Sequence, residues 1–378
     1  MDAEILTGLY VSEFKALRSI NTRIEPLTIV IGGNGTGKTS LLQSIIHTKD
    51  LLGSGTEAQQ LATKSTNQYF HIQCPHIVIS KNSRANSSPS DPGDALMIEH
   101  LGAHIKYSHM MTPAAPDCDG WVKVGSEDVI LRTFAGVLRN IGYFRLESEM
   151  LTRADYSEDL RPTISSNGIG IASTLTQLQL EGHENYLRLN EMVSEVVPQF
   201  RRVRARRAKV NRQVETLVEI AGKSHAFPEE KEYAGYELIF DMANVKDLPA
   251  RFVSEGTLLV LGLLTIILGP NKQRILLLDD IDRGLHPVAQ GRLMELLRKL
   301  VNEIPGLQII ATTHSPEVVA HMKPEEVLVL ALDDEGYSHC ARMDEHPEFE
   351  RWKDEMNPGE FWSVFGEDWV TKKDKADE

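Results

Sequence analysis

Residues 29–40 read IVIGGNGTGKTS and carry the clearest signal for the class of fold. Residues 32–39 match the phosphate-binding pattern G-x-x-x-x-G-K-[ST] at every fixed position. The glycines at 33, 35 and 37 allow the backbone to curl, so that successive N–H groups point at phosphate oxygens. An apolar strand, residues 27–31, precedes the loop, and an apolar helical stripe follows it. The alternative is a glycine-rich turn that binds nothing, and the surrounding strand, lysine and helix argue against it.

The pattern assigns roles to individual residues of this loop. Lys38 is expected to reach the β- and γ-phosphates of a nucleotide, and the Thr39 hydroxyl to bind Mg²⁺. The helix that begins near Lys38 adds the positive end of its dipole at the same place. The candidate nucleotide-binding residues are Gly32, Gly33, Asn34, Gly35, Thr36, Gly37, Lys38, Thr39 and Ser40.

Composition narrows the class of protein. The 378 residues can hold one large domain or two ordinary ones, and 41% apolar residues are enough for a sizeable core. The net charge of −14 argues against a surface that coats nucleic acid all round, although it allows a local basic groove. The acidic start lacks the layout of a signal peptide, and no apolar run reaches the ~20 residues that span a bilayer. Three widely spaced cysteines indicate reduced thiols, so we expect a soluble, cytoplasmic protein without a membrane segment.

The first half of the chain gives weaker signals than the loop. Residues 6–11 predict a strand that is joined to the strand before the loop through a turn at 21–23. Alternation near 70–80 predicts further strands, and the polar segment 82–93 predicts a loop. Residues 172–197 predict helix.

The last third is more regular. The apolar run 275–278 is typical of a strand that is buried on both faces of a parallel sheet. A helix is expected from Pro287, a second strand over 307–312, and a further helix from Ser315-Pro316. Residues 327–332 give a third strand. This alternation predicts a parallel sheet with right-handed crossovers.

Two segments at the ends of these strands carry candidate catalytic residues. Asp279 and Asp280 leave the strand 275–278, where Asp279 would hold Mg²⁺ and Asp280 would orient or deprotonate the attacking water. His314 follows the next strand at the same sheet edge and could sense the γ-phosphate. An acidic turn and a structural histidine are the alternatives, and the accompanying loop favours the functional interpretation.

A third segment, Ser254-Glu255-Gly256, precedes the apolar helix 258–268. A small hydroxyl residue and a glycine at a helix N-terminus make an anion site. An ordinary helix N-cap is the stronger competing interpretation at this position.

Taken together, these motifs resemble the ABC-type ATPase heads of the SMC, recombination-repair and OLD-like group, in its AAA-labelled prokaryotic, defence-associated branch. GGNGTGKTS resembles the Walker A motif of the family, and VSEGTLLVLGLL resembles its degenerate ABC signature. LLLLDDIDRGLHP is similar to the segment that joins Walker B to the D-loop, and TTHSPEVV to the switch-histidine segment. The resemblance covers about residues 1–50 and 250–335, with weaker similarity between them.

The resemblance implies an α/β fold of the P-loop NTPase class: an ABC-type ATPase head with a parallel core sheet, an antiparallel β element and a helical insertion. The head would span 1–335, with core motifs in 1–50 and 235–335 and an inserted lobe at about 51–234; an aromatic, acidic tail would span 336–378. The cofactors would be ATP and Mg²⁺. Two copies would dimerise head to tail, each ATP held by one P-loop and covered by the partner's signature segment.

One departure from the family concerns Asp280, where the family usually has Glu. The shorter side chain loses roughly 1.5 Å of reach, and misplacing a catalytic group by about 1 Å can cost on the order of 10²-fold in rate. We therefore expect slow hydrolysis, which Asp282, the family's D-loop acid, could partly support.

Three other features have open interpretations. Residues 201–212 carry seven positive charges, which fit either a phosphate-backbone contact or a face that balances nearby acids. The aromatic residues after 349 could staple the tail to the head or anchor a partner protein. His71, Cys74 and His76 make only a weak metal pattern.

The sequence leaves competing functions. The leading one is an ATP-gated dimer in a DNA-linked or antiphage-defence complex with a separate, nuclease-like effector, with nucleic acid as a further possible partner. A nucleotide-dependent scaffold with little turnover is the alternative, which Asp280 favours. Ser254 and His314 argue against a P-loop kinase or GTPase.

Overall fold

The structure is a computed structural model. It describes residues 5–53, 69–74, 77–82, 95–100, 103–108, 140–181, 183–220, 223–270 and 273–372. The chain divides into two compact units. The first comprises residues 1–143, 273–282 and 297–378, and the second comprises 144–272 and 283–296. The predicted loop at 82–93 lies, except for Asn82, outside the described residues.

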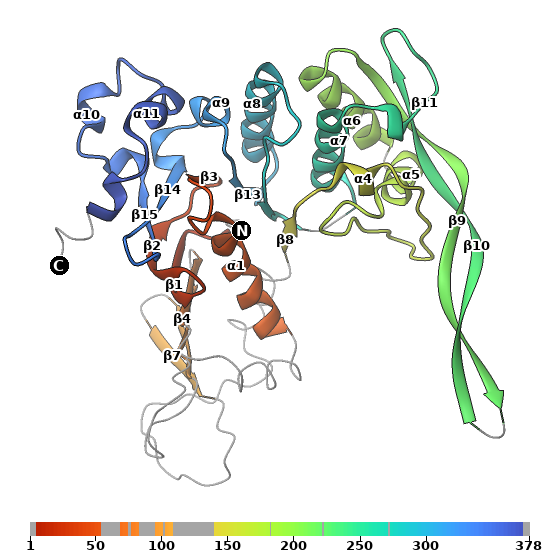
Figure 1. Cartoon of the computed structure of the whole chain (residues 1–378), viewed down its shortest axis with the longest axis horizontal. Helices are drawn as coiled ribbons and strands as arrows, with labels where there is room; N and C mark the ends of the chain where they lie inside the picture. Colours follow the sequence, from red (N-terminus) through yellow and green to blue (C-terminus); the bar gives the residue numbers. More distant parts are fainter. Residues whose placement is uncertain are drawn as a thin grey trace. The chain divides into compact units, whose positions relative to one another are not determined.

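The first unit is built on a sheet whose strands run in the order β7-β6-β5-β4-β1-β2-β15-β14-β3-β13-β12-β8 (Figure 1). The strands are β1 (Gly8–Phe14), β2 (Leu17–Arg23), β3 (Leu27–Gly32), β4 (Tyr69–Cys74), β5 (Ile77–Asn82), β6 (Ala95–His100), β7 (Ala103–Ser108), β8 (Ile141–Phe144), β12 (Ile275–Leu278), β13 (Gln308–Thr312), β14 (Val327–Leu332) and β15 (Ser338–Arg342). Its helices are α1 (Lys38–Gly53), α9 (Pro316–Ala320), α10 (Phe349–Trp352) and α11 (Pro358–Phe365), and α8 (Pro287–Glu303) spans the division.

The centre of this sheet is parallel, as predicted. β3 pairs in parallel with both β13 and β14, and β13 pairs in parallel with β12. All residues of β3, β12 and β13 are buried, because the strands are covered on both faces. The strand before the P-loop therefore lies between β13 and β14, the two strands that follow the acidic and histidine segments.

One predicted turn is wrong. Residues 21–23 end β2, and β1 and β2 form an antiparallel hairpin that turns at Lys15 and Ala16. Lys15 has a φ of 54°, the left-handed conformation that such a tight turn requires. The polar residues at the end of β2 are exposed or half-buried there, so their polarity reflects the surface and not a turn.

The second unit contains α4 (Ser148–Leu151), α5 (Ile171–Glu181), α6 (His183–Val196) and α7 (Glu255–Leu268), with the strands β9 (Phe200–Ile220), β10 (Lys223–Met242) and β11 (Leu248–Pro249). The predicted helical stretch 172–197 is thus two helices, α5 and α6. β9 and β10 form a long antiparallel hairpin, and β11 pairs with the edge of β10 that faces away from β9.

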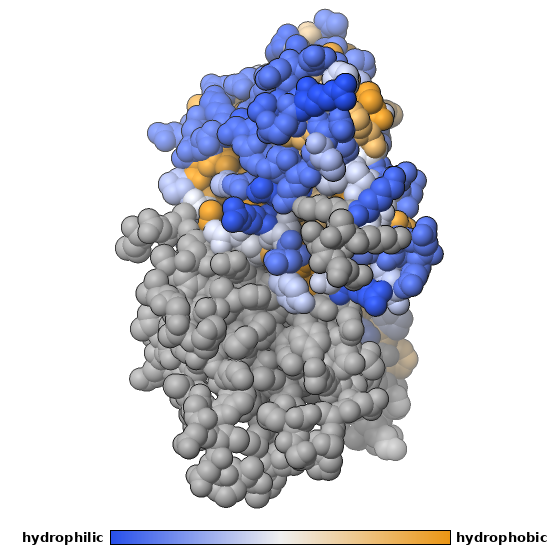
Figure 2. Space-filling model, turned by 90° about the vertical axis from the view of Figure 1, so that its left-hand side faces the viewer, coloured by the Kyte–Doolittle hydropathy of each residue, from blue (hydrophilic) through white to orange (hydrophobic). Residues whose placement is uncertain are grey.

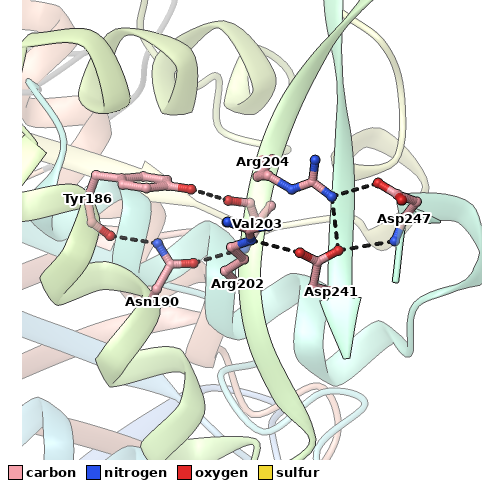
Figure 3. A network of polar contacts seen from close by, with 7 residues as sticks. All are labelled: Tyr186, Asn190, Arg202, Val203, Arg204, Asp241 and Asp247. Carbon is pink, nitrogen blue, oxygen red and sulfur yellow. Dashed lines mark hydrogen bonds and ion pairs between the residues drawn. The ribbon is translucent and has the colours of Figure 1, made fainter. Parts of the chain in front are cut away.

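A polar network fixes the base of this hairpin to α6 (Figure 3). The Asn190 side chain accepts a hydrogen bond of 2.8 Å from the N–H of Val203, and the Tyr186 hydroxyl donates one of 2.6 Å to the carbonyl of Val203. On the neighbouring strand, Asp241 accepts hydrogen bonds from Arg202 at 2.7 Å and from Arg204 at 3.0 Å. The network holds β9 where Phe200 and Phe240 pack edge to face.

The basic residues of 201–212 lie on β9, opposite an acidic strand. Arg202 and Arg204 form ion pairs with Asp241, and Arg206 pairs with Glu237 at 2.6 Å. Lys209 pairs with Glu232 at 2.8 Å. Much of the positive charge is therefore balanced across the hairpin, which agrees with the interpretation of 201–212 as a face that balances nearby acids.

Candidate functional site

The phosphate-binding loop joins β3 to α1 within the first unit. Both the N–H and the hydroxyl of Thr36 donate to the carbonyl of Gly33, at 3.4 and 2.9 Å. Gly37 has a φ of 94°, and a β-carbon placed on it would lie 2.7 Å from the Ser338 hydroxyl. Glycine is required there for both reasons. Asn34 and Gly35 are exposed at the tip of the loop, and Ser40 lies half-buried in the first turn of α1.

Lys38 lies across the loop that contains it. Its ammonium donates to the carbonyls of Gly32 and Gly33 at 2.9 and 2.8 Å, and the residue is 7% exposed. Burial lowers the pKa of Lys38 below its usual value. The carboxylates of Asp280, Asp279 and Glu367, in that order, oppose this shift. Incoming phosphate groups would replace the two carbonyls as partners of a cation that is already in place.

Asp279, at the end of β12, lies at the centre of the site. It is 6% exposed and accepts hydrogen bonds from the hydroxyls of Thr312 at 2.6 Å, Thr39 at 3.0 Å and Tyr143 at 3.1 Å. The two residues expected to bind Mg²⁺ are thus in direct contact. Their hydroxyl and carboxylate oxygens are the ligands that Mg²⁺ prefers, with one carboxylate and substrate phosphates as its usual set.

Asp280 has an unusual backbone. Its φ is 59°, and its N–H donates to the Thr312 hydroxyl at 2.9 Å. Non-glycine residues rarely adopt this left-handed conformation, and Asp and Asn tolerate it best because their short polar side chains make local hydrogen bonds. The backbone at this position therefore provides a physical reason for Asp in place of the longer Glu.

The loops that follow β12 and β13 are joined to each other. Asp282 accepts a hydrogen bond from the Thr313 hydroxyl at 2.6 Å and one from the N–H of His314 at 3.4 Å. The N–H of Ile281 donates to the carbonyl of Thr312 at 3.0 Å. His314 is exposed on this joined pair of loops, at the same sheet edge as Asp279. A movement of either loop would therefore be transmitted to the other.

Ser254, Glu255 and Gly256 belong to the second unit. Ser254 is the N-cap of α7: its hydroxyl accepts from the N–H of Thr257 at 3.4 Å and lies 2.7 Å from the Thr257 hydroxyl. Glu255 forms an ion pair of 3.0 Å with Arg283. A β-carbon on Gly256 would clash with the carbonyl of Gly284, so glycine is needed for this close approach. The N-cap interpretation accounts for the local geometry of Ser254, and an anion-site role requires a ligand from elsewhere.

Three residues of the site were not found from the sequence. Thr312 and Tyr143 hold Asp279, and Glu367 from the C-terminal tail lies next to Gly33. A hydroxyl residue at the end of β13 was a visible signal for Thr312, since it precedes the histidine segment. Tyr143 and Glu367 had no such signal, because only the folded chain brings them to the loop.

The weak metal pattern remains untested. His71 and Cys74 lie in β4, whose side chains are not described, and His76 lies outside the described residues. Within the part of the chain that the structure covers, no group of three or more His, Cys, Asp or Glu side chains is arranged to hold a metal ion. Likewise, no helix among the described residues is long and apolar enough to cross a membrane.

Comparisons with known proteins agree with this geometry. Residues 157–320 match the family model described as AAA domain, putative AbiEii toxin, Type IV TA system. An SMC head bound to the C-winged helix domain of ScpA superimposes with a TM-score of 0.55 at 13% identity, over 89% of this chain and 98% of that one. The fold is that of an SMC head. The Smc head domain with an extended coiled coil from Pyrococcus furiosus, bound to the C-terminal domain of ScpA, gives a TM-score of 0.53 at 12% identity, over 93% of this chain and 99% of that one.

One curated relative is similar to part of this chain. The Septu protein PtuA of Bacillus thuringiensis is 30% identical over 99 residues, which are 26% of this chain and 22% of the relative. The match thus spans about a fifth of the length of that protein. The expected fold class is confirmed: an SMC-head-like α/β fold with a parallel core, a separate antiparallel sheet and helices. The expected family resemblance agrees with the AAA-domain match over 157–320 and with the partial likeness to PtuA.

Proposed function

We propose that the chain binds and hydrolyses ATP as an ABC-type ATPase head. The observation that carries this proposal is the contact of Thr39 with Asp279, 3.0 Å apart, beside the buried Lys38. The lysine and the hydroxyl lie at the N-terminus of α1, and the carboxylate after β12 contacts the hydroxyl. Together they are the groups that a Mg²⁺–triphosphate needs. We retain residues 1–335 as the head, with core motifs in 1–50 and 235–335 and the lobe 51–234 inserted, and 336–378 as its tail.

In this proposal each residue has a distinct task. The backbone of residues 32–37 and the N-terminus of α1, including Ser40, bind the phosphates, and Lys38 neutralises them. Thr39 and Asp279 would hold Mg²⁺, which contributes positive charge at the phosphates when bound. Asp280 orients or deprotonates the attacking water, and His314 contacts the γ-phosphate.

We further propose that ATP joins two copies of the chain. The Ser254-Glu255-Gly256 segment of one copy would cover the nucleotide held by the P-loop of the other. The N-terminus of α7 supports this role, since helix N-termini bind anions and Ser254 lies at its cap. The structural likeness to SMC heads supports it at the level of fold.

The likeness to PtuA supports a place in a DNA-linked or antiphage-defence complex. The chain would act there as the regulatory ATPase, with a separate, nuclease-like effector protein. Nucleic acid is a further candidate partner: Arg201 and Arg207 are exposed on β9, although the neighbouring ion pairs reduce the local positive charge. The cytoplasm is the expected location.

The second candidate is a scaffold that positions an effector with little turnover. Asp280 favours it, because a short carboxylate on a left-handed backbone is a poor substitute for Glu.

Turnover and binding, measured on the wild type and on Lys38→Ala, test the two candidates. The ATPase proposal expects the wild type to bind ATP and to hydrolyse it faster than Lys38→Ala. If the wild type binds ATP but hydrolyses it no faster than Lys38→Ala does, the scaffold candidate is supported. Failure of the wild type to bind ATP would contradict both.

A further inference from the structure

A carboxylate from the C-terminal tail lies against the phosphate-binding loop. A β-carbon placed on Gly33 would be 2.9 Å from Oε1 of Glu367. The negative charge of Glu367 also acts on Lys38. The tail thus places an anion beside the loop that we propose binds anionic phosphates.

Local structure holds Glu367 in this position. Helix α11 ends at Phe365, and its C-cap residue, Gly366, has a φ of 62° and donates its N–H to the carbonyl of Trp362 at 2.8 Å. This C-cap ends the helix and turns the chain directly before Glu367. The indole N–H of Trp362 then donates to Oε2 of Glu367 at 3.4 Å. Val370, one turn further on, is 1% exposed and anchors the segment.

The tail itself is packed onto the unit that carries the loop. Helix α11 contacts α9, where a β-carbon on Gly359 would clash with the carbonyl of Pro316. The ring of His346 lies 5.0 Å from those of Phe361 and Phe365 and 4.8 Å from that of Trp369, between ring centroids. In Figure 2 the coloured part of the face that carries α10 and α11 is mostly hydrophilic, with separate apolar areas between the hydrophilic residues. These ring contacts hold the segments of the tail together, and the packing of α11 on α9 holds the tail against the first unit. The segment that carries Glu367 is therefore fixed in position.

We propose that Glu367 is a residue of the nucleotide site that sets its affinity: the carboxylate repels triphosphate and competes with it for Lys38. Two like charges about 4 Å apart repel with an energy that corresponds to roughly a fivefold change in binding at the dielectric constant of water, and to a larger change near a protein surface. Nucleotide would bind fully only when the carboxylate moves aside. Because Trp362 holds the carboxylate, nucleotide binding and the position of the tail would be linked. This inference rests on the proposed function.

The test compares the affinity of a non-hydrolysable Mg²⁺–ATP analogue for the wild type, Glu367→Gln and Asp368→Asn, measured by calorimetry. Asp368→Asn is the matched control, because it removes the same charge from the neighbouring, exposed residue. We expect Glu367→Gln to bind about tenfold more tightly and Asp368→Asn to stay within about twofold of the wild type. The gain for Glu367→Gln should shrink in high salt, which a purely structural effect would not do.

Unchanged or weaker binding by Glu367→Gln, or an equal gain in Asp368→Asn, would overturn the proposal. Melting without nucleotide checks that the three proteins are equally folded. Lys38→Ala, measured in the same series, separates the two claims. If the wild type binds and Lys38→Ala does not, the nucleotide site stands whatever Glu367 does. If the wild type fails to bind, the proposed function fails first.

Discussion

The hydroxyl of Thr312 joins the two acidic residues of the site: it donates to Asp279 at 2.6 Å and accepts from the N–H of Asp280 at 2.9 Å. One side chain thereby fixes both the expected Mg²⁺ ligand and the backbone that carries the expected base. We predict that Thr312→Val lowers ATP turnover by about 10²-fold, because a displacement near 1 Å has that effect. Binding of the analogue should fall much less. Thr312→Ser keeps the hydroxyl and should recover most of the turnover. Equal losses in both variants would contradict this role.

A longer carboxylate at position 280 gives the second prediction. Asp280→Glu should raise turnover, since it restores the reach of the family's usual residue. It should also lower the free energy of unfolding by about 1 kcal/mol, because Glu tolerates the left-handed backbone less well than Asp. Steady-state hydrolysis and denaturant unfolding measure the two effects. If turnover does not rise, the shortened side chain is not what limits hydrolysis.

The base of the β9–β10 hairpin gives a prediction about stability. Asp241 accepts hydrogen bonds from the N–H of Asp247 and from Arg202 and Arg204, and Asp241→Asn should cost about 2 kcal/mol of unfolding free energy. Glu237→Gln removes a more exposed pair with Arg206 on the same hairpin and should cost about 0.5 kcal/mol. Chemical unfolding of both variants checks the difference. Similar losses of unfolding free energy in the two variants would show that the hydrogen bonds of Asp241 stabilise the fold no more than the exposed ion pair does.

The same carboxylate has a pH signature. The backbone N–H of Asp247, followed by Arg202, holds the pKa of Asp241 well below its usual value. The folded state therefore binds fewer protons than the unfolded state in acid. The stabilisation is complete above the unfolded pKa of about 3.9 and is lost as pH falls towards the folded pKa. The stability difference between wild type and Asp241→Asn should accordingly narrow in acid.

The tail has a titrating group of its own in His346. Burial lowers the pKa of this imidazole, and Glu348 opposes the shift only in part. Above the usual value of about 6.5 the imidazole is neutral in both states, and its contribution is complete. Below that value the unfolded state takes up the proton first, so stability falls. We predict that acidification from about pH 7.5 to 5.5 lowers the melting temperature of the wild type more than that of His346→Gln. Parallel losses would exclude His346 as the cause.

Much of the first unit could be predicted from local patterns. The apolar runs at 275–278 and 327–332 are the strands β12 and β14 with the same limits, because strands buried along all or nearly all of their length have no polar interruption. The glycines and Lys38 predicted the strand, loop and helix around them for the same local reason.

The parts that could not be predicted depend on contacts between distant residues. Nothing in the sequence tells that β3 lies between β13 and β14, or that Tyr143 reaches Asp279. The polar end of β2 was interpreted as a turn, because exposed strand ends and turns share a composition. Glu367 is one of many acids in a charged tail until α11 docks on α9.

We propose that a complete site takes Lys38 from one copy and Ser254 from another. The test is to mix Lys38→Ala with Ser254→Arg and to measure mass by light scattering, with and without Mg²⁺–ATP. Each variant alone should show no ATP-dependent gain in mass, because all of its sites lack one half. The mixture should form ATP-dependent dimers, in which one site combines an intact Lys38 with an intact Ser254. A mixture that behaves as the average of its two components would contradict a site that two copies share.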